Sequence, residues 1–123
     1  MNDKELTLLA QSLVHPMKLS REDMDAATVG CAILAHSGKV YTGVCISVSC
    51  GMGFCAEHAA IAEMIKGKET KIKVIVAAHE DGVIAPCGRC REFMKQIDNE
   101  NLKARVLLEN NRSAKLEELL PQC

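Results

Sequence analysis

The sequence predicts a three-layer α/β/α domain with a mixed sheet, on two observations. Apolar stretches of strand length alternate with amphipathic stretches of helix length, in the order helix, hairpin, helix, strand, helix, strand. No repeat, linker or low-complexity tract interrupts this alternation. The 123 residues therefore suit a single domain, residues 1–123, large enough to bury roughly two thirds of its unfolded surface.

The first half of the chain predicts a helix, a hairpin and a second helix. Residues 3–14 place apolar side chains on one helical face, and Pro16 ends that helix. An apolar run over 29–35, a turn at Ser37-Gly38 and a second run over 39–47 predict a hairpin. Residues 49–53 form a glycine-containing loop, and 55–66 predict a helix that ends at Gly67.

The second half adds two strands and a third helix. Residues 71–78 predict a buried strand, a turn at 79–82 follows, and 83–86 lead into a helix over 87–97. Residues 104–108 predict the fourth strand. The segment 113–120 fits either a helix throughout or a short edge strand followed by one helical turn over 117–120.

Composition argues against nucleic-acid and membrane partners. The chain has 15 basic and 16 acidic side chains, a net charge of -1, one Tyr, two Phe and no Trp, so it offers neither a basic stripe nor many rings for stacking bases. It has no apolar run of 18 residues and no secretory signal. We therefore expect a cytoplasmic location and a small-molecule ligand.

Seven cysteines without a secretory signal argue against a disulfide framework, because their number is odd. Cys31 and Cys45 lie inside strand-like apolar runs, where a free thiol packs as a small hydrophobic group. Cys123, the last residue, is expected to be an incidental exposed thiol. Metal binding or catalysis remains for the others.

Two short stretches carry the chemistry, Cys55-Ala56-Glu57-His58 and Pro86-Cys87-Gly88-Arg89-Cys90. Each begins a predicted helix, where free backbone N–H groups favour thiolate over thiol. The C-x-x-C spacing lets two sulfurs face one ion, and Pro86 fixes the approach of the chain. With Cys55 as a third thiolate, the pattern predicts a zinc ion that keeps one position free for water.

Glu57 distinguishes an enzyme from a structural zinc site. In the first turn of a helix a glutamate complements the helix dipole, but two residues from a zinc ligand it can also move protons to and from a water at the metal. Three thiolates leave zinc with a net negative charge, and His58, Arg89 and Arg91 are the candidates to offset that charge from around the ligands.

These motifs resemble the cytidine deaminase superfamily, in which Cys-Ala-Glu precedes Pro-Cys-Gly-x-Cys. Residues 37–43, 85–91 and 118–121 are also similar to the small cytidine deaminases and blasticidin S deaminases. The resemblance implies a five-stranded sheet flanked by helices, one zinc per subunit held by Cys55, Cys87 and Cys90, and a homotetramer whose subunits help to close each pocket.

The resemblance also implies a reaction. It is the hydrolytic deamination of a cytosine-containing nucleoside or analogue, such as cytidine, deoxycytidine or a blasticidin-like compound, at the C–N bond of a cyclic amidine. Glu57 is the proton shuttle between the water at the zinc and a ring nitrogen, and ammonia is released. Backbone groups around Cys55-Ala56 and Pro86-Cys87 are expected to hold the water and the amino group.

The substrate pocket departs from the family pattern. Small cytidine deaminases read ribose with Asn-x-Glu on the second strand and pack the base on a Phe before the first strand. This chain has Cys45-Ile46-Ser47 and Ala27 at those places. Phe54 either supplies an apolar wall or packs in the core. The substrate-binding candidates are therefore Cys45, Ser47, Phe54, Ala56 and Pro86.

Two other classes of function fit parts of the pattern. His58 lies three residues after Cys55 and could close a structural Cys₃His zinc site, or Cys50 could close a Cys₄ site, and either would make a non-catalytic module. Cys87-Gly-Arg-Cys90 also resembles a redox dithiol, which would leave Cys55 and Glu57 without a role.

Overall fold

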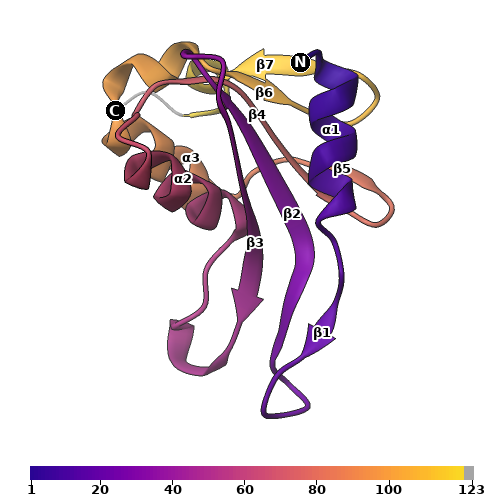
Figure 1. The fold of residues 1–123 in the computed structure, drawn as a ribbon. Helices are drawn as coiled ribbons and strands as arrows, with labels where there is room; N and C mark the ends of the chain where they lie inside the picture. The colour runs from indigo at the N-terminus through magenta and orange to yellow at the C-terminus, as the bar shows by residue number, and fades with distance from the viewer. Residues whose placement is uncertain (121–123) are drawn as a thin grey trace.

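The computed structural model describes residues 1–120, which form one mixed sheet with helices on both faces (Figure 1). The helices are α1 (Asp3–Ser12), α2 (Ala56–Lys66) and α3 (Gly88–Ile97). The strands are β1 (Met17–Lys18), β2 (Asp25–Ala35), β3 (Val40–Ser47), β4 (Ile72–His79), β5 (Gly82–Ile84), β6 (Arg105–Leu107) and β7 (Ser113–Lys115). Short 3₁₀ turns cover Ser49–Gly51, Asn99–Lys103 and Leu116–Leu119.

The main part of the sheet has the order β3-β2-β4-β6-β7, in which only the β4–β6 pair is parallel. The short strand β1 pairs with the first residues of β2, and β5 pairs with the last residues of β4. Figure 1 shows that the start of β2 and the end of β3 extend well beyond β4, with β1 beside the start of β2. The loop after β3 therefore starts far from the central layer and must return to reach α2.

The three-layer α/β/α class with a mixed sheet is confirmed, whereas the expected count of five strands is wrong. Among the described residues the sheet has seven strands, because β1 and β5 add to the five of the main path. These two strands contain two and three residues. Such short segments show no period-2 pattern that a sequence could display.

One face of the sheet is covered by α1. Asn2 and Glu5 form a capping box at its start, and Leu6 and Ala10 are its buried residues. They pack against alternate side chains of the central strands: Ala32, Val74, Val76, Ala78 and Leu107. Gly30 allows this close approach, because a Cβ atom there would lie 2.3 Å from the Ala10 carbonyl oxygen.

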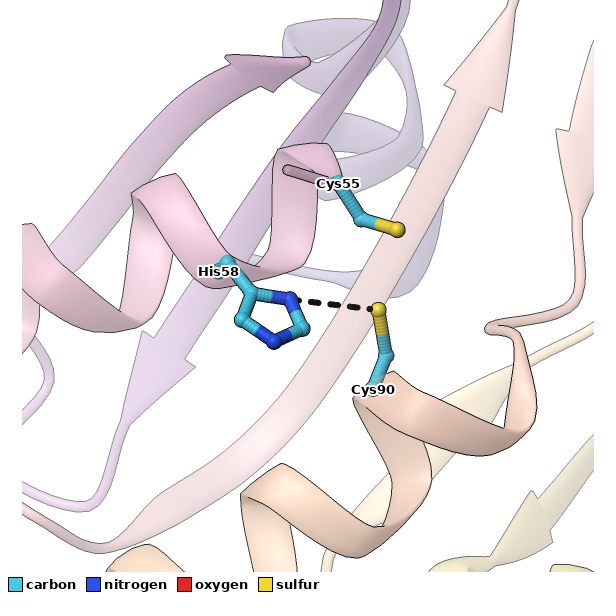
Figure 2. A group of neighbouring side chains, drawn as sticks. All are labelled: Cys55, His58 and Cys90. Atoms are coloured by element: carbon cyan, nitrogen blue, oxygen red, sulfur yellow. Dashed lines mark hydrogen bonds between the residues drawn. The ribbon is translucent and has the colours of Figure 1, made fainter. Parts of the chain in front are cut away.

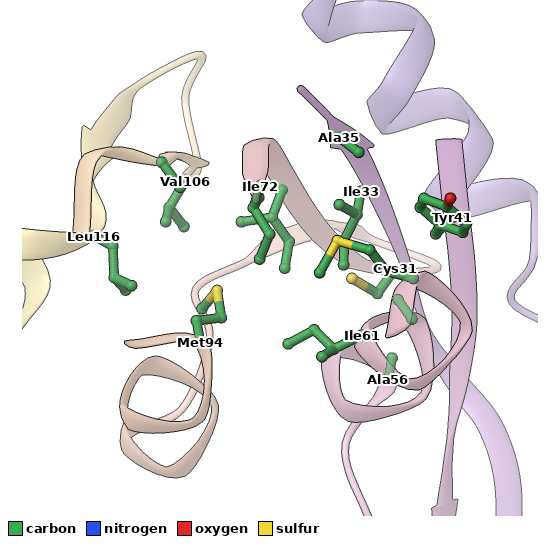
Figure 3. Packing of buried hydrophobic residues seen from close by; sticks show 14 of the residues in the cluster. Cys31, Ile33, Ala35, Tyr41, Ala56, Ile61, Ile72, Met94, Val106 and Leu116 are labelled. Atoms are coloured by element: carbon green, nitrogen blue, oxygen red, sulfur yellow. The ribbon is translucent and has the colours of Figure 1, made fainter. Parts of the chain in front are cut away.

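The other face carries the larger core, beneath α2 and α3 (Figure 3). Ile61 and Met64 of α2 and Met94 of α3 are fully buried there, together with Cys31 and Ile33 of β2. Gly43 of β3 brings α2 against the sheet, since a Cβ atom there would lie 2.4 Å from the Ala60 backbone nitrogen. Both site helices are thereby fixed on one rigid layer.

Most predicted elements are confirmed, with shifted ends. The first helix ends two residues earlier than expected, and β2 begins four residues before the apolar run at Val29. The segment 113–120 follows the second alternative, an edge strand and then a 3₁₀ turn that begins at Leu116. Cys31 and Cys45 are buried in strands as predicted, whereas Pro121 and Cys123 lie outside the described residues.

Within residues 1–120, none of the helices combines the length and the apolar character that crossing a bilayer requires.

Candidate metal centre

The two cysteine motifs meet because both site helices begin at the same end of the large core. Cys55 is the N-cap residue of α2, and Cys87 is the N-cap residue of α3. The loop after β3 returns through a bridge between Ile46 and Phe54, with hydrogen bonds of 3.0 and 2.9 Å, and this bridge places Cys55. The β4–β5 hairpin precedes Cys87 and fixes where the chain enters α3.

Four candidate ligand atoms lie together at this point. The Cys55 Sγ is 3.7 Å from the Cys87 Sγ, which is 3.4 Å from the Cys90 Sγ. The Cys90 Sγ is in turn 3.5 Å from the His58 Nδ1 (Figure 2). The ligand atoms of Cys55, His58 and Cys90 all lie within 4.8 Å of one another.

This donor set fits zinc. With a Zn–S bond of about 2.3 Å, two sulfurs of a tetrahedral site lie about 3.8 Å apart, and the two sulfur pairs on either side of Cys87 are close to that separation. Thiolate and imidazole are also the ligands that zinc prefers. The described cysteines are free rather than disulfide-bonded, so their sulfurs are available to a metal.

Glu57 lies beside this cluster in a buried position. Its side chain is only 4% exposed, and it contributes to the wall of a cavity next to the cysteines. Burial raises the pKa of its carboxyl group above the usual range, although its hydrogen bonds lower it in part. A carboxyl group with a raised pKa can both accept and return a proton near neutral pH.

The thiols differ in their surroundings. Burial raises the pKa of Cys90 and of Cys55. Burial also acts on Cys87, but hydrogen bonds with the Cys90 and Arg89 backbone and the neighbouring thiols bring its pKa below the usual value. Cys55 and Cys87 are both N-cap residues, and the backbone hydrogen bonds from Cys90 and Arg89 to the Cys87 sulfur account for the lower pKa of Cys87.

His58 and Arg89 both lie beside the cluster. The His58 ring stacks on Phe93 with 4.2 Å between ring centroids and an angle of 6° between planes. Burial, with a smaller contribution from the Arg89 charge, lowers the pKa of His58. Arg89 is exposed and lines the same cavity as Glu57, so its guanidinium group faces solvent at the mouth of the site.

Arg91 acts on the backbone rather than on the sulfurs in this structure. Its Nε donates to the Pro86 carbonyl oxygen at 2.8 Å, and its Nη1 donates to the Leu119 carbonyl oxygen at 2.9 Å. Pro86 is buried and is not among the residues that line the cavity. Arg91 thus ties the chain before Cys87 to the C-terminal turn.

The cavity beside the cluster has a volume of about 510 Å³, which suits a small molecule. Four of the predicted substrate residues line it, namely Cys45, Ser47, Phe54 and Ala56. Among the residues of 1–120 that line it, Glu57 is the one carboxylate and Arg89 the one permanently charged cation. A larger cavity of about 800 Å³ lies between α1, the β4–β5 turn and the β6–β7 turn, and none of the candidate site residues lines it.

Thr28 and Phe93 are not among the predicted site residues, although each contacts one of them. Thr28 lines the cavity, and its hydroxyl lies 3.2 Å from the Cys45 Sγ. A bulge in β2 sets its direction, because Ala27 is buried with a φ of 60°, and a sequence does not show such a bulge. Phe93 could have been found, since it follows Cys90 by three residues and shares its helix face.

Cys50, the candidate for a Cys₄ site, lies apart from the cluster. It is exposed in the 3₁₀ turn after β3 with a φ of 61°, and within residues 1–120 its sulfur shares none of the contacts that link Cys55, Cys87, Cys90 and His58. The structure therefore offers His58, rather than Cys50, as the one alternative fourth ligand.

Comparison of the sequence with known proteins finds similarity to zinc-binding deaminases. The family described as "Cytidine and deoxycytidylate deaminase zinc-binding region" matches residues 3–105. A probable cytidine deaminase from Dictyostelium discoideum is 31% identical over 96 residues, which cover 76% of this chain and 65% of that protein. A cytidine deaminase from Mycobacterium tuberculosis is 31% identical over 95 residues, covering 76% of this chain and 69% of that protein.

Solved structures share the fold over the full length. The cytidine deaminase from Mycobacterium tuberculosis superposes with a TM-score of 0.80 at 24% identity, covering 100% of this chain and 98% of that one. The enzyme from Burkholderia pseudomallei gives a TM-score of 0.80 at 24% identity, covering 100% and 99%. At this identity the likeness concerns the fold.

Proposed function

The chain belongs to the cytidine and deoxycytidylate deaminase family, and from that membership we propose that it is a zinc-dependent hydrolytic deaminase of a cytosine-containing nucleoside or analogue. One observation carries the proposal. The buried carboxyl group of Glu57 lies beside the thiol cluster and lines a cavity of ligand size. A purely structural zinc site requires neither the buried acid nor the cavity.

The proposed zinc ligands are Cys55, Cys87 and Cys90, with one ion per subunit. The short distances from the Cys87 sulfur to the Cys55 and Cys90 sulfurs support this assignment. In a protein with Cys50 and Cys123 replaced by serine, thiol labelling of the native zinc-loaded form should find no fast-reacting cysteine. Chelation should then expose three reactive thiols, whereas a redox pair would yield two.

Zinc, when bound, would act as a Lewis acid that makes water a better nucleophile near neutral pH. Glu57 would accept a proton from the attacking water and deliver it to the ring nitrogen beside the amine-bearing carbon. The water oxygen is then bonded to that carbon as a hydroxyl group. Its remaining proton passes to the amino group, the carbon–nitrogen bond breaks as the carbonyl forms, and ammonia leaves. The buried position of Glu57 excludes bulk water from these transfers.

The residues that line the cavity restrict which cytosine-containing compounds it can bind. Where small cytidine deaminases carry an amide and a carboxylate for ribose, this wall has Cys45 and Ser47, and the Cys45 sulfur already contacts the Thr28 hydroxyl. A buried sugar hydroxyl without a partner costs about 1 to 3 kcal/mol. We therefore propose a cytosine-containing substrate whose ring substituent makes fewer buried polar contacts than ribose.

A screen of ammonia release tests the function. Zinc-loaded protein is offered cytosine, cytidine, deoxycytidine, N4-modified cytidines and blasticidin S. We expect release from at least one of these compounds, with cytidine a poor substrate relative to the best one. If zinc is bound at one per subunit and none of the compounds yields ammonia, the proposed function is wrong.

A closed Cys₃His site in a non-catalytic module is the second candidate. The 3.5 Å separation between the Cys90 Sγ and the His58 Nδ1 favours it, because two ligands of one zinc ion have a similar separation. The two candidates differ in whether water can exchange at the metal. Ammonia release above the rate of a metal-free control would exclude the closed site.

We also propose that the protein is a cytoplasmic homotetramer. The free cysteines of residues 1–120 suit a reducing compartment. Met52 is 71% exposed and Phe54 is 37% exposed near the mouth of the cavity, and exposed apolar side chains are common at contacts between subunits. Sedimentation equilibrium measures the assembly directly, and a monomer at micromolar concentration would contradict this part.

A further inference from the structure

Cys90 is the most deeply buried of the three proposed ligands and the one that most needs a partner for its charge. It is fully buried, whereas Cys55 is half-buried and Cys87 is exposed. Cys55 and Cys87 precede the first turns of their helices, where backbone N–H groups are free. Cys90 lies inside the first turn of α3, so its thiolate depends more on a side-chain donor.

The His58 ring is the nitrogen group that faces this sulfur. Its Nδ1 lies 3.5 Å from the Cys90 Sγ, within the range of a hydrogen bond to sulfur, and Figure 2 shows the ring edge directed at that sulfur. With the proton on Nδ1, the ring can donate to a thiolate. Cys87, Cys55 and Glu57 also contact the Cys90 sulfur. With zinc bound, the two cysteines are thiolates and cannot donate a hydrogen bond, and Glu57 is the proposed proton carrier, so His58 is the lasting side-chain donor.

The ring cannot turn freely, because it lies flat against Phe93. The centroid separation of 4.2 Å and the angle of 6° describe a parallel stack. Phe93 is one helical turn after Cys90 on the same helix, so α3 carries both the sulfur and the platform that aligns its partner. Such a stack holds the nitrogen of His58 at one distance from Cys90.

We propose that His58 is a positioning residue that donates its Nδ1–H to the Cys90 thiolate, and that Phe93 holds it in this role. The inference rests on the proposed ligand set and adds Phe93 to the residues that the centre requires. It also decides between the two readings of the Cys90–His58 contact, since a donor leaves the fourth metal position open and a ligand closes it. The hydrogen bond between the His58 ring and the Cys90 sulfur then links α2 to α3.

The first test needs no variant. Zinc-edge X-ray absorption of the zinc-loaded protein should show three sulfurs and one lighter oxygen neighbour, without the outer-shell scattering of a coordinated imidazole. Detection of a coordinated imidazole would overturn the proposal, because His58 would then be a ligand. Ammonia release is measured on the same sample, so a failure of the positioning role is distinguished from a failure of the enzymatic function.

Matched variants test the donor. His58→Asn places an amide nitrogen near the position of Nδ1, whereas His58→Ala removes the donor. Outer partners of metal ligands typically contribute about 10- to 100-fold to metal affinity, so His58→Ala should bind zinc that much more weakly in chelator competition. His58→Asn should restore most of the affinity. If both variants bind zinc as tightly as the native protein, His58 has no positioning role.

The platform is tested by a second pair. Phe93→Leu removes the ring and keeps an apolar side chain, and Phe93→Tyr keeps the stack. In cobalt-substituted protein, loss of a hydrogen bond to sulfur shifts the thiolate-to-metal charge-transfer band to lower energy. We expect this shift for His58→Ala and Phe93→Leu, and the native band for Phe93→Tyr. A native band in Phe93→Leu, with native zinc affinity, would contradict the role of Phe93.

Discussion

At the scale of single residues, the centre depends on side chains that hold the chain as much as on those that meet the metal. Arg91 illustrates this, because its guanidinium group donates hydrogen bonds to two carbonyl oxygens instead of to the thiolates. The Pro86 carbonyl precedes the first ligand of α3, and Leu119 belongs to the last described turn. One side chain therefore fixes the approach to Cys87 from a distant part of the sequence.

Replacing Arg91 should destabilise the protein and disturb the metal site. Arg91→Met leaves two carbonyl oxygens without their charged donor, and each such hydrogen bond contributes about 1.5 to 3 kcal/mol. Both bonds are only part-buried, so water replaces the lost donors in part, and we expect the free energy of unfolding in urea to fall by about 2 to 4 kcal/mol rather than by the full sum. Arg91→Lys keeps the charge and can reach one of the two carbonyl oxygens. Its free energy of unfolding should therefore lie between those of Arg91→Met and the native protein. An unchanged free energy in Arg91→Met would show that both bonds are dispensable.

At the scale of elements, the site depends on how closely α2 approaches β3. The helix carries Cys55, Glu57 and His58 within its N-cap and first turn. Gly43 sets the separation, because an added Cβ atom would meet the Ala60 nitrogen at 2.4 Å and the Ala59 Cβ at 2.6 Å. Neither obstacle is the end of a flexible side chain, so the whole helix would have to move.

Gly43→Ala should therefore affect stability and metal binding together. Overpacking of this kind costs about 1 to 3 kcal/mol, and a displaced α2 carries one proposed ligand, Cys55, away from the two on α3. The matched control is Gly88→Ala, because a Cβ atom there meets nothing within 4 Å and its φ is not positive. Urea unfolding and zinc competition measure both effects. If Gly43→Ala and Gly88→Ala behave alike, helix position does not limit the site.

The contacts of Asp98, between the end of α3 and the start of β4, make the stability of the fold depend on pH. Asp98 accepts a hydrogen bond from the Thr70 hydroxyl at 2.7 Å and another from the Glu100 backbone at 2.9 Å. The Thr70 bond is the largest cause that lowers the pKa of Asp98, followed by that backbone bond. A carboxyl group with a lowered pKa stabilises the fold above its unfolded pKa, about 3.9, and this stability is lost as the pH falls through the folded pKa.

Thr70→Val should make that acid-induced loss smaller. The variant has a pKa of Asp98 closer to the unfolded value, so it is less stable than the native protein at pH 7 and loses less stability as the pH falls below about 4. Urea unfolding at a series of pH values measures both free energies. The two curves should converge in acid, and parallel curves would show that Thr70 does not act through the ionisation of Asp98.

The sequence predicts the elements, and which cysteines lie together, where local chemistry determines them. The helices, the hairpin and the motif of Cys55, Cys87 and Cys90 follow from periodicity and spacing along the chain. The strands β1 and β5 do not, because two or three residues carry no pattern and their pairing depends on β2 and β4. The direction of Thr28 and the contacts of Arg91 depend in the same way on distant backbone.

At the scale of the whole molecule, the sheet separates a stabilising face from a reactive one. The face under α1 has an apolar cluster without any candidate site residue. The opposite face packs α2 and α3 side by side on one core, and their N-termini bring three sulfurs and Glu57 together. The rigid layer explains how cysteines that lie about thirty residues apart in the sequence meet at one point.

The measurement that tests this account most directly is zinc content and ammonia release in Glu57→Gln. The substitution preserves shape and removes the group that exchanges protons, so zinc should stay at one per subunit. The rate on the best substrate of the screen should fall by about 10²- to 10⁴-fold, which is the usual contribution of a general acid or base. A variant that keeps its zinc and deaminates at the native rate would contradict the assignment of Glu57 and, with it, the proposed mechanism.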